Sequence, residues 1–203
     1  GALPSLTFFE AATLLAWRAF AEANVRIAVL EVGLGGRLDA TTVCAPKVTV
    51  ITRIGFDHTD RLGPTLDAIA REKAGILKPG VPCVLGPDLT HARNAEARAA
   101  IEAVAREVGA PLVDTPPYDV LDDGARVAWR GTSVVVQPSL RGAWQAGNLA
   151  TAVRALELLH HATPPITTEA LHAGIAATRW PARMERLHDT LLDVAHNIDG
   201  VEA

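Results

Sequence analysis

The sequence predicts an α/β protein with a mainly parallel sheet flanked by helices. Short, apolar, β-branched runs alternate along the chain with longer segments in which apolar residues recur at helical spacing. This alternation is typical of parallel sheets, because each crossover helix packs back against the sheet. With 203 residues, 49% of them hydrophobic, the chain is long enough to bury a substantial core.

The first predicted elements are a helix and two strands. Thr7 and Glu10 form a capping-box pattern at the start of the helix, which should end near Asn24. The run VRIAVLEV, residues 25–32, is short, apolar and β-branched, and it indicates a strand buried on both faces. The run KVTVITRI, residues 47–54, indicates a second buried strand.

The next part of the chain continues the alternation. A helix over about 65–76 is followed by the stop signal KPG, and a third strand spans 81–86. Thr90 is the predicted cap of a long helix that reaches Val108. A short strand, PLVDT, comes directly after this helix.

The pattern then changes to an antiparallel one. The runs 125–130 and 132–137 predict a hairpin that turns near Gly131 and lies on the edge of the parallel sheet. Helices are predicted over 145–161 and 167–178.

The end of the chain predicts a second domain. A strand at LLDVA and a helix start at HNIDG form what looks like the first βα unit of a C-terminal α/β domain, truncated at the end of the sequence. We therefore expect a central domain over residues 1–179 and the truncated start of another over 180–203.

Composition excludes several functional classes. The net charge is −4, and no basic run with interleaved aromatic residues indicates nucleic-acid binding. No apolar run approaches a membrane span, and the N-terminal residues do not form a signal segment. Cys44 and Cys83 are too few for a disulfide framework and too far apart for a CxxC metal site. We expect a cytoplasmic protein that binds neither nucleic acid nor membrane.

Polar residues follow the first two predicted strands. Glu31 closes one strand, and Asp57 and His58 come after the next. Because ligands of open parallel sheets bind outside the carboxyl ends of the strands, Glu31 and His58 are expected to converge there. A carboxylate and an imidazole suit a divalent cation whose shell is completed by phosphate oxygens and water. Taken singly, Glu31 also fits a solvated strand end, and the Asp-His pair also fits a turn.

The stretch EVGLGGRLDATT needs a separate interpretation. Its glycines, Gly33, Gly35 and Gly36, give GxGG rather than GxGxxG, and no long helix follows, so a dinucleotide-binding loop is disfavoured. A tight turn with positive backbone φ angles explains the glycines, but it does not explain Arg37 and Asp39.

Five segments occur in order: EVGLGGRLDATT, ITRIGFDHTDRLG, IAREKAGILKPG, GNLATAVRAL and LLDVAHNIDG. Together they resemble the folylpolyglutamate synthase and dihydrofolate synthase branch of the Mur ligase superfamily, over nearly the whole chain. The resemblance implies a monomeric ligase that uses ATP to phosphorylate the carboxylate of dihydropteroate or a reduced folate. L-Glutamate then attacks the acyl phosphate. Mg²⁺ is the implied metal, and a monovalent cation is a further candidate.

The resemblance also implies roles for individual residues. Glu31 and His58 match the family's magnesium ligands. Lys73 matches a lysine that is carbamylated in relatives, which turns a cation into an anion that supports the metal. From the residues alone, a surface lysine near a helix C-terminus is the favoured interpretation of Lys73, and the resemblance reverses that preference. These three are the predicted catalytic and metal-binding residues. The predicted substrate contacts are Thr7, Phe8, Arg37 and Asp39.

The nucleotide contacts are implied in the same way. Gln145 and Asn148 match a segment whose asparagine contacts adenine, although an asparagine near a helix start also suits a cap. Arg183 matches the arginine of a WPGRxE pattern and suits polyphosphate, because its guanidinium is planar and permanently charged. Asp193 and His196 match residues that meet the ribose and phosphate of the nucleotide.

Departures from the family pattern are also visible. Thr42 and Ala182 replace a usual asparagine and glycine, and the chain contains no Gly-Lys dipeptide, so a Gly-Lys-Ser or Gly-Lys-Thr phosphate loop is absent. We expect this chain to be a central part of the enzyme that binds MgATP poorly and catalyses little alone. Two alternatives remain open: a peptidoglycan-precursor ligase of the same superfamily, and a non-catalytic ligand-binding module that has lost the phosphate loop.

Overall fold

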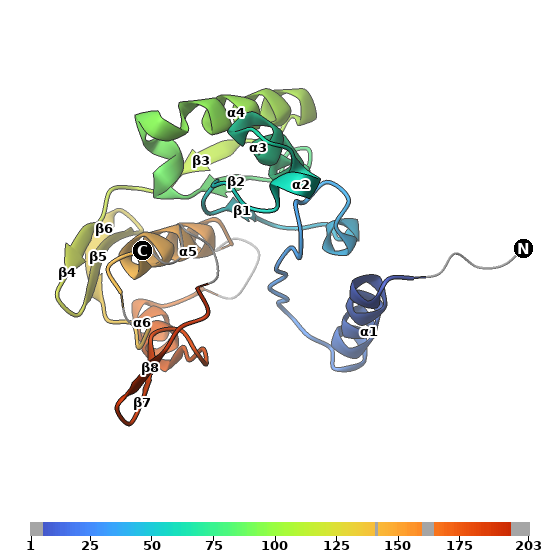
Figure 1. Ribbon diagram of the computed structural model, residues 1–203. Coiled ribbons are helices and arrows are strands. Elements are labelled where there is room, and N and C mark those ends of the chain that lie inside the picture. The colour runs from blue at the N-terminus through green and yellow to red at the C-terminus, as the bar shows by residue number, and fades with distance from the viewer. Residues whose placement is uncertain (1–5, 141, 160–164, 196–203) are drawn as a thin grey trace, which may run out of the picture.

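The computed structural model describes residues 6–140, 142–159 and 165–195, and it confirms the predicted α/β class (Figure 1). A three-stranded parallel sheet has the order β1-β2-β3. Its strands are β1 (Thr49–Ile51), β2 (Cys83–Leu85) and β3 (Leu112–Asp114). Strand β2 lies in the middle and is buried along its whole length, as a strand covered on both faces should be.

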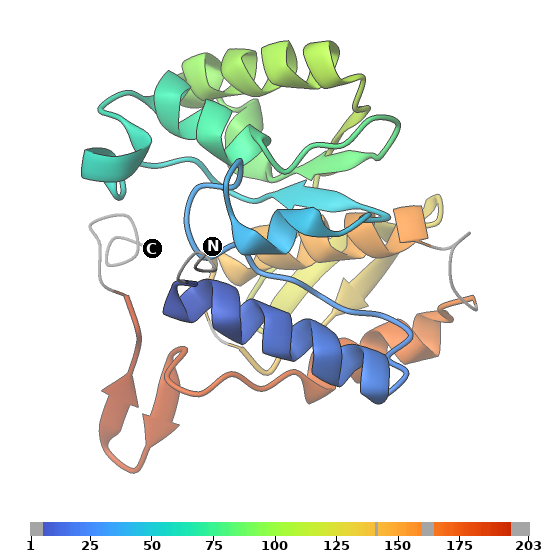
Figure 2. The ribbon, with the colours of Figure 1, turned by 90° about the vertical axis from the view of Figure 1, so that its right-hand side faces the viewer.

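Helices cover both faces of this sheet. Helices α3 (Leu66–Ala74) and α4 (Ala95–Val108) lie side by side on one face, and α5 (Gln145–Leu159) lies against the other (Figure 1 and Figure 2). The core between the sheet and α3 and α4 contains Ile69 and Ile101, both fully buried. None of the helices in the described part of the chain combines the length and the apolar composition that a membrane span requires.

The predicted hairpin exists, but it does not lie on the edge of the parallel sheet. It joins a further strand to form a separate antiparallel sheet in the order β4-β5-β6. These strands are β4 (Asp119–Leu121), β5 (Gly124–Trp129) and β6 (Thr132–Val136). Alternate residues of β5, among them Val127 and Trp129, are buried against α5 and α6 (Thr168–Ala177). Because α5 packs between the two sheets, the hairpin cannot extend the parallel one.

The N-terminal region confirms one prediction and corrects another. Helix α1 (Phe8–Glu22) begins with the predicted capping box, in which Thr7 and Glu10 each satisfy the other's backbone N–H. Residues 25–32, however, form no strand, and Val29 is 92% exposed. The prediction of a first buried strand was therefore wrong for this structure. A strand needs a neighbour for its backbone hydrogen bonds, and no described segment pairs with this run.

The start of α4 also differs from its prediction. Thr90 is not its cap, because the chain first makes two short 3₁₀ turns, η2 (Pro87–Thr90) and η3 (Ala92–Asn94). The hydroxyl of Thr90 donates to the carbonyl of Pro87 instead. Helix α4 starts only after Asn94, a buried residue whose side-chain amide donates to the carbonyl of Asp88. These local side-chain hydrogen bonds stabilise the 3₁₀ turns, so the α-helix begins later in the sequence than Thr90.

The described C-terminal residues form a hairpin, and the structure does not test the predicted βα unit. Strands β7 (Glu185–Leu187) and β8 (Thr190–Leu192) pair antiparallel and extend away from the sheets (Figure 2). The strand predicted at LLDVA is therefore shorter and belongs to this hairpin. The predicted helix start at HNIDG lies outside the described residues.

Ala182 generates a prediction from this hairpin region. Its φ angle is +57°, a left-handed conformation that costs an L-residue about 1–2 kcal/mol and glycine almost nothing. We expect Ala182→Gly to raise the free energy of unfolding by roughly 0.5–1 kcal/mol, since the added freedom of the unfolded chain offsets part of the gain. Urea unfolding measures this change.

The matched control for Ala182→Gly is Ala173→Gly. Ala173 is exposed in the interior of α6, where glycine should lower the free energy of unfolding by roughly 0.5–1 kcal/mol. A loss of stability in both variants would show that Ala182 is not strained.

Candidate functional site

The glycine loop, residues 33–39, packs directly against the C-terminal end of α3. A Cβ atom on Gly36 would lie 2.8 Å from the carbonyl oxygen of Lys73. A Cβ atom on Gly75 would lie 2.3 Å from the Cα of Arg37. Neither position has room for a side chain, so two glycines allow loop and helix to meet backbone against backbone.

An ion pair links the same two segments. Oxygen Oε1 of Glu72 accepts a hydrogen bond from Arg37 Nε at 3.0 Å, and Arg37 Nη2 lies 2.9 Å from the same oxygen in an ion pair. The backbone N–H of Arg37 also donates to the carbonyl of Glu72 at 2.9 Å. Sequence reasoning missed Glu72, although it directly precedes Lys73 in the EKAGI segment. The predicted role of Arg37 as a substrate contact stays a prediction.

Asp39 organises the loop from within. It is buried, and its Oδ2 accepts the backbone N–H groups of Gly33 at 2.9 Å and Leu34 at 3.3 Å. Its Oδ1 accepts the backbone N–H of Thr41 at 2.9 Å and the hydroxyl at 2.6 Å. Burial alone would raise the pKa of this carboxyl, but the hydrogen bonds from Thr41, Leu34 and Gly33 outweigh it and hold the pKa below its ordinary value. A substrate contact by Asp39 stays a prediction.

The residues before the loop come from α1 and the irregular segment that follows. Glu31 is exposed, and because residues 25–32 form no strand, it does not close one. The ring of Phe9 lies against Gly33, where a Cβ would be 2.8 Å from its Cζ. Sequence reasoning named Phe8, which is 90% exposed, and Thr7, which caps α1; Phe9 is the aromatic residue that contacts the loop.

His58 stands at the start of the short helix α2 (Thr59–Leu62). Its φ angle is +48°, which is uncommon outside glycine and marks residues that the surrounding structure holds in place, often at functional sites. Asp57 accepts the backbone N–H of His58 at 2.9 Å, and its Oδ1 lies 3.8 Å from His58 Nε2. Leu62 then packs against the glycine loop, 3.1 Å from the Cβ position of Gly35.

Among the described residues, no hydrogen bond or ion pair joins the side chains of Glu31, His58 and Lys73, but the segments that carry them are neighbours. The loop after Glu31 contacts both α2, which His58 precedes, and the end of α3, which carries Lys73. Within the described residues, no group of three His, Cys, Asp or Glu side chains is close enough to hold a metal ion. A carboxylate, an imidazole and a carbamate oxygen fit Mg²⁺, which keeps several waters and relies on substrate phosphates for the rest of its shell.

Gln145 and Asn148 lie together at a pocket of about 460 Å³ between α5 and α6. The side-chain amide of Asn148 donates to Oε1 of Gln145 at 2.9 Å. The remaining lining is mostly apolar and includes Leu140, Leu149 and Ile166. Asn148 is not a helix cap, because α5 already begins at Gln145. An apolar slot with two side-chain amides suits a flat, hydrogen-bonding ring.

Arg183 and Asp193 lie beside the β7–β8 hairpin. Asp193 accepts the backbone N–H groups of Ala195 at 2.8 Å and Met184 at 2.9 Å, and these bonds lower the pKa of its carboxyl. Neither Arg183 nor Asp193 is among the residues that line the pocket between α5 and α6. The predicted phosphate contact His196 lies outside the described residues.

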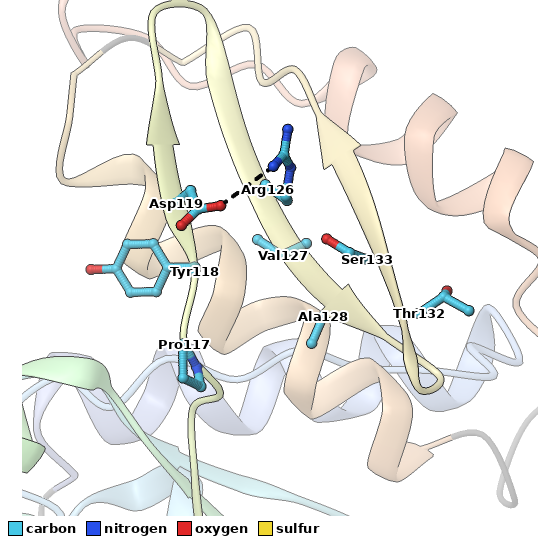
Figure 3. A pocket seen from close by; sticks show the side chains of 8 residues that line it. All are labelled: Pro117, Tyr118, Asp119, Arg126, Val127, Ala128, Thr132 and Ser133. Carbon is cyan, nitrogen blue, oxygen red and sulfur yellow. Dashed lines mark ion pairs between the residues drawn. The ribbon is translucent and has the colours of Figure 1, made fainter.

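A second hollow, of about 260 Å³, lies on the antiparallel sheet (Figure 3). Asp119 and Arg126 face each other on neighbouring strands, 3.7 Å apart, and Tyr118 and Ser133 lie beside them. Both charged side chains are more than half exposed, so solvent screens their interaction. None of the predicted site residues lines this hollow, which is a surface feature separate from the candidate site.

The role of Asp39 is testable by its pH dependence. We expect Asp39→Asn to lower the free energy of unfolding at neutral pH by about 2 kcal/mol, because a buried, charged acceptor is lost. Since folding depresses the pKa of Asp39, its stabilisation is present above the unfolded pKa of about 3.9 and is lost as pH falls through the folded pKa. The difference from wild type should therefore shrink below about pH 4.

Urea unfolding across that pH range, with Asp119→Asn as the exposed control, provides the measurement. A control that destabilises the protein as much as Asp39→Asn, or a difference that grows in acid, would contradict the assigned role.

Comparison with known proteins identifies the family. The sequence model of the Mur ligase middle domain matches residues 5–115, more than half of the chain. The folylpolyglutamate synthase of Lacticaseibacillus casei is 34% identical over 213 residues, which cover 97% of this chain and 48% of the relative. The chain thus spans about half the length of such relatives.

Solved structures agree with this result. E. coli FolC in complex with DHPP and ADP has a TM-score of 0.83 and 35% identity, covering 98% of this chain and 46% of that one. A bifunctional folylpolyglutamate synthase/dihydrofolate synthase with Mn, AMPPNP and L-glutamate bound has a TM-score of 0.77 and 36% identity, covering 97% and 46%. The chain belongs to the Mur ligase middle domain family, and the relatives it resembles here are folylpolyglutamate and dihydrofolate synthases.

Proposed function

We propose that this chain is the central part of an ATP-dependent ligase that adds L-glutamate to dihydropteroate or a reduced folate. The γ-phosphoryl group of ATP passes to a carboxylate oxygen of the pterin substrate, which forms an acyl phosphate and ADP. The amine of glutamate attacks the acyl carbon, the carbon–oxygen bond to phosphate breaks, and the nitrogen loses a proton. The products are an amide, ADP and phosphate.

One observation supports this proposal: the loop after Glu31 packs against Leu62 at the end of α2, which His58 precedes, and against the backbone of Lys73 at the end of α3. A phosphoryl transfer needs charge to be neutralised and reactants to be positioned, rather than covalent help from the protein. Bound Mg²⁺ would neutralise charge on the transferred phosphoryl group. Glu31 and His58 are the residues we propose as its ligands, with Lys73 supporting them when carbamylated.

Lys73 has the setting that such a modification needs. It is half-buried near the C-terminal end of α3. Among the described residues, no carboxylate lies within ion-pair distance of its ammonium group, and the adjacent Glu72 is engaged by Arg37. Carbamylation would replace the ammonium of Lys73 by an anionic carbamate, the form in which we propose that it supports the metal ligands.

The pocket between α5 and α6 supports a nucleotide in this proposal. Its apolar walls suit the faces of an adenine ring, and Asn148 and Gln145 supply hydrogen bonds at its rim. Structures of relatives were solved with AMPPCP, AMPPNP or ADP. We propose that Arg183 and Asp193 act on the phosphate and ribose end of the nucleotide.

The function is tested by glutamate-dependent release of phosphate from MgATP with dihydropteroate as acceptor. The assay uses this chain and a longer version with flanking sequence on both sides. Activity in the longer version supports the folate-branch ligase. If neither well-folded version releases phosphate with dihydropteroate, the proposed reaction is contradicted. Turnover of a UDP-muramyl acceptor instead would favour a peptidoglycan-precursor ligase.

Glu31 and His58 generate a sharper prediction in the active version. Glu31→Ala and His58→Ala should each lower kcat by at least about 100-fold, because a lost ligand leaves charge on the phosphoryl group unneutralised. Thermal unfolding should stay near wild type, since both side chains are exposed. A fully active Glu31→Ala enzyme would refute the ligand assignment.

Asn148 should control the choice of nucleotide. We expect Asn148→Ala to weaken ATP binding roughly 5- to 50-fold by isothermal titration, the range of a lost hydrogen bond inside a pocket. The control is Gln137→Ala, which removes an exposed side-chain amide directly after β6 and outside the pocket. Equal affinities of all three proteins would remove Asn148 from the nucleotide site.

A further inference from the structure

We propose that Arg37 and Glu72 act as a positioning pair, which holds the loop that follows Glu31 against the helix that carries Lys73. This inference rests on the function proposed above, because it concerns the same candidate metal site. Neither residue needs to touch metal or substrate for this role. The pair acts through its effect on where the two proposed metal-binding segments lie.

The geometry of the pair is specific. Arg37 Nε donates to one carboxylate oxygen of Glu72 at 3.0 Å, and Arg37 Nη2 lies 2.9 Å from that same oxygen. The Glu72 side chain is 28% exposed and that of Arg37 57%, so the carboxylate is partly shielded from water. The two residues are 35 positions apart in sequence. The pair is therefore a tertiary link rather than a local helix interaction.

A backbone hydrogen bond also joins the loop to α3, from the N–H of Arg37 to the carbonyl of Glu72 at 2.9 Å, and it remains when the Arg37 side chain is removed. The Arg37–Glu72 ion pair adds a side-chain link to this backbone bond. Asp39 binds Gly33, Leu34 and Thr41, and so it ties the loop to itself. The glycines at 36 and 75 allow close approach, but glycine also gives the backbone the greatest freedom to move. The close packing at these glycines does not by itself stop the loop backbone from moving. We infer that the side-chain link from Arg37 to α3 restricts this movement.

The position of the pair determines what it controls. Glu72 is the direct neighbour of Lys73, and Arg37 lies in the loop that Glu31 leads into. Loss of the pair would let the loop shift relative to α3, and the carboxylate of Glu31 would lose its position relative to Lys73. Residues that orient metal ligands typically change metal affinity 10- to 100-fold when they are replaced.

The test uses this chain and four variants. Arg37→Ala removes the ion pair. Arg37→Lys keeps the positive charge but loses the planar guanidinium with its several N–H donors. The double variant Arg37→Glu with Glu72→Arg exchanges the two charges. The matched control is Arg71→Ala. Arg71 lies next to Glu72 on α3 and pairs with Asp67 of the same helix at 2.9 Å, so its ion pair does not link α3 to the loop.

Three measurements separate positioning from simple stability. Hydrogen exchange in peptides over residues 31–42 reports the loop, with the α4 peptide over 95–108 as an internal reference. Electron paramagnetic resonance gives the dissociation constant for Mn²⁺ in the presence of ATP. Thermal unfolding reports overall stability. A merely structural pair would change the melting temperature without changing Mn²⁺ affinity at a temperature where every variant is folded.

We expect Arg37→Ala to speed exchange in 31–42 about threefold or more, with the α4 peptide unchanged. Mn²⁺ binding should weaken at least about tenfold. Arg37→Lys should fall between Arg37→Ala and wild type in both measurements, the reversed pair should recover at least part of each loss, and Arg71→Ala should match wild type.

Two results would overturn the inference in different ways. If wild type binds Mn²⁺ and Arg37→Ala binds it equally well, the pair does not position the site, while the proposed metal site stands. If wild type binds no Mn²⁺ in this chain or in the active longer version, the proposed metal site fails and the positioning role fails with it.

Discussion

The candidate site depends on one steric constraint, which is the direct backbone packing of residues 35–37 against the end of α3. Gly36 and Gly75 each occupy a place where a Cβ atom would collide with backbone of the other segment. Any side chain at either position would push the loop away from the helix. The Arg37–Glu72 pair depends on this contact, because it joins the same two segments.

Polar contacts rather than apolar burial shape the rest of the loop. Asp39 satisfies backbone N–H groups that a loop without secondary structure would otherwise leave to water, and its depressed pKa reflects those bonds. His58 is held in a left-handed conformation beside the same loop. The site therefore combines close glycine packing with a residue at positive φ. The two apolar cores, by contrast, are held together by burial of apolar side chains.

Local signals predicted much of the fold. The capping box of Thr7, the parallel strands and the helices α3 and α5 were all visible as patterns of residue type and spacing. Predictions failed where strand pairing or a competing local hydrogen bond decided the outcome. Residues 25–32 have strand-like composition, but no described segment pairs with them. Thr90 is a good cap by type, yet its hydroxyl binds the carbonyl of Pro87.

The site shows the same division. Motifs in the sequence pointed to Glu31, His58 and Lys73, and to a place among the folate-branch ligases. The motifs did not reveal Glu72, because its partner Arg37 lies 35 residues away in the sequence. They did not reveal Phe9 either, because its ring packs against Gly33, which has no side chain to signal the contact.

The sequence by itself determined the α/β class, the order of most elements and the family. These depend on local periodicity and on motifs that are contiguous in the sequence. Only the tertiary structure decided that the antiparallel hairpin forms its own sheet over α5, and that Arg37 and Asp39 bind within the protein. The reason is physical: the energy of an ion pair or a packed backbone depends on distance in space, and folding alone sets that distance.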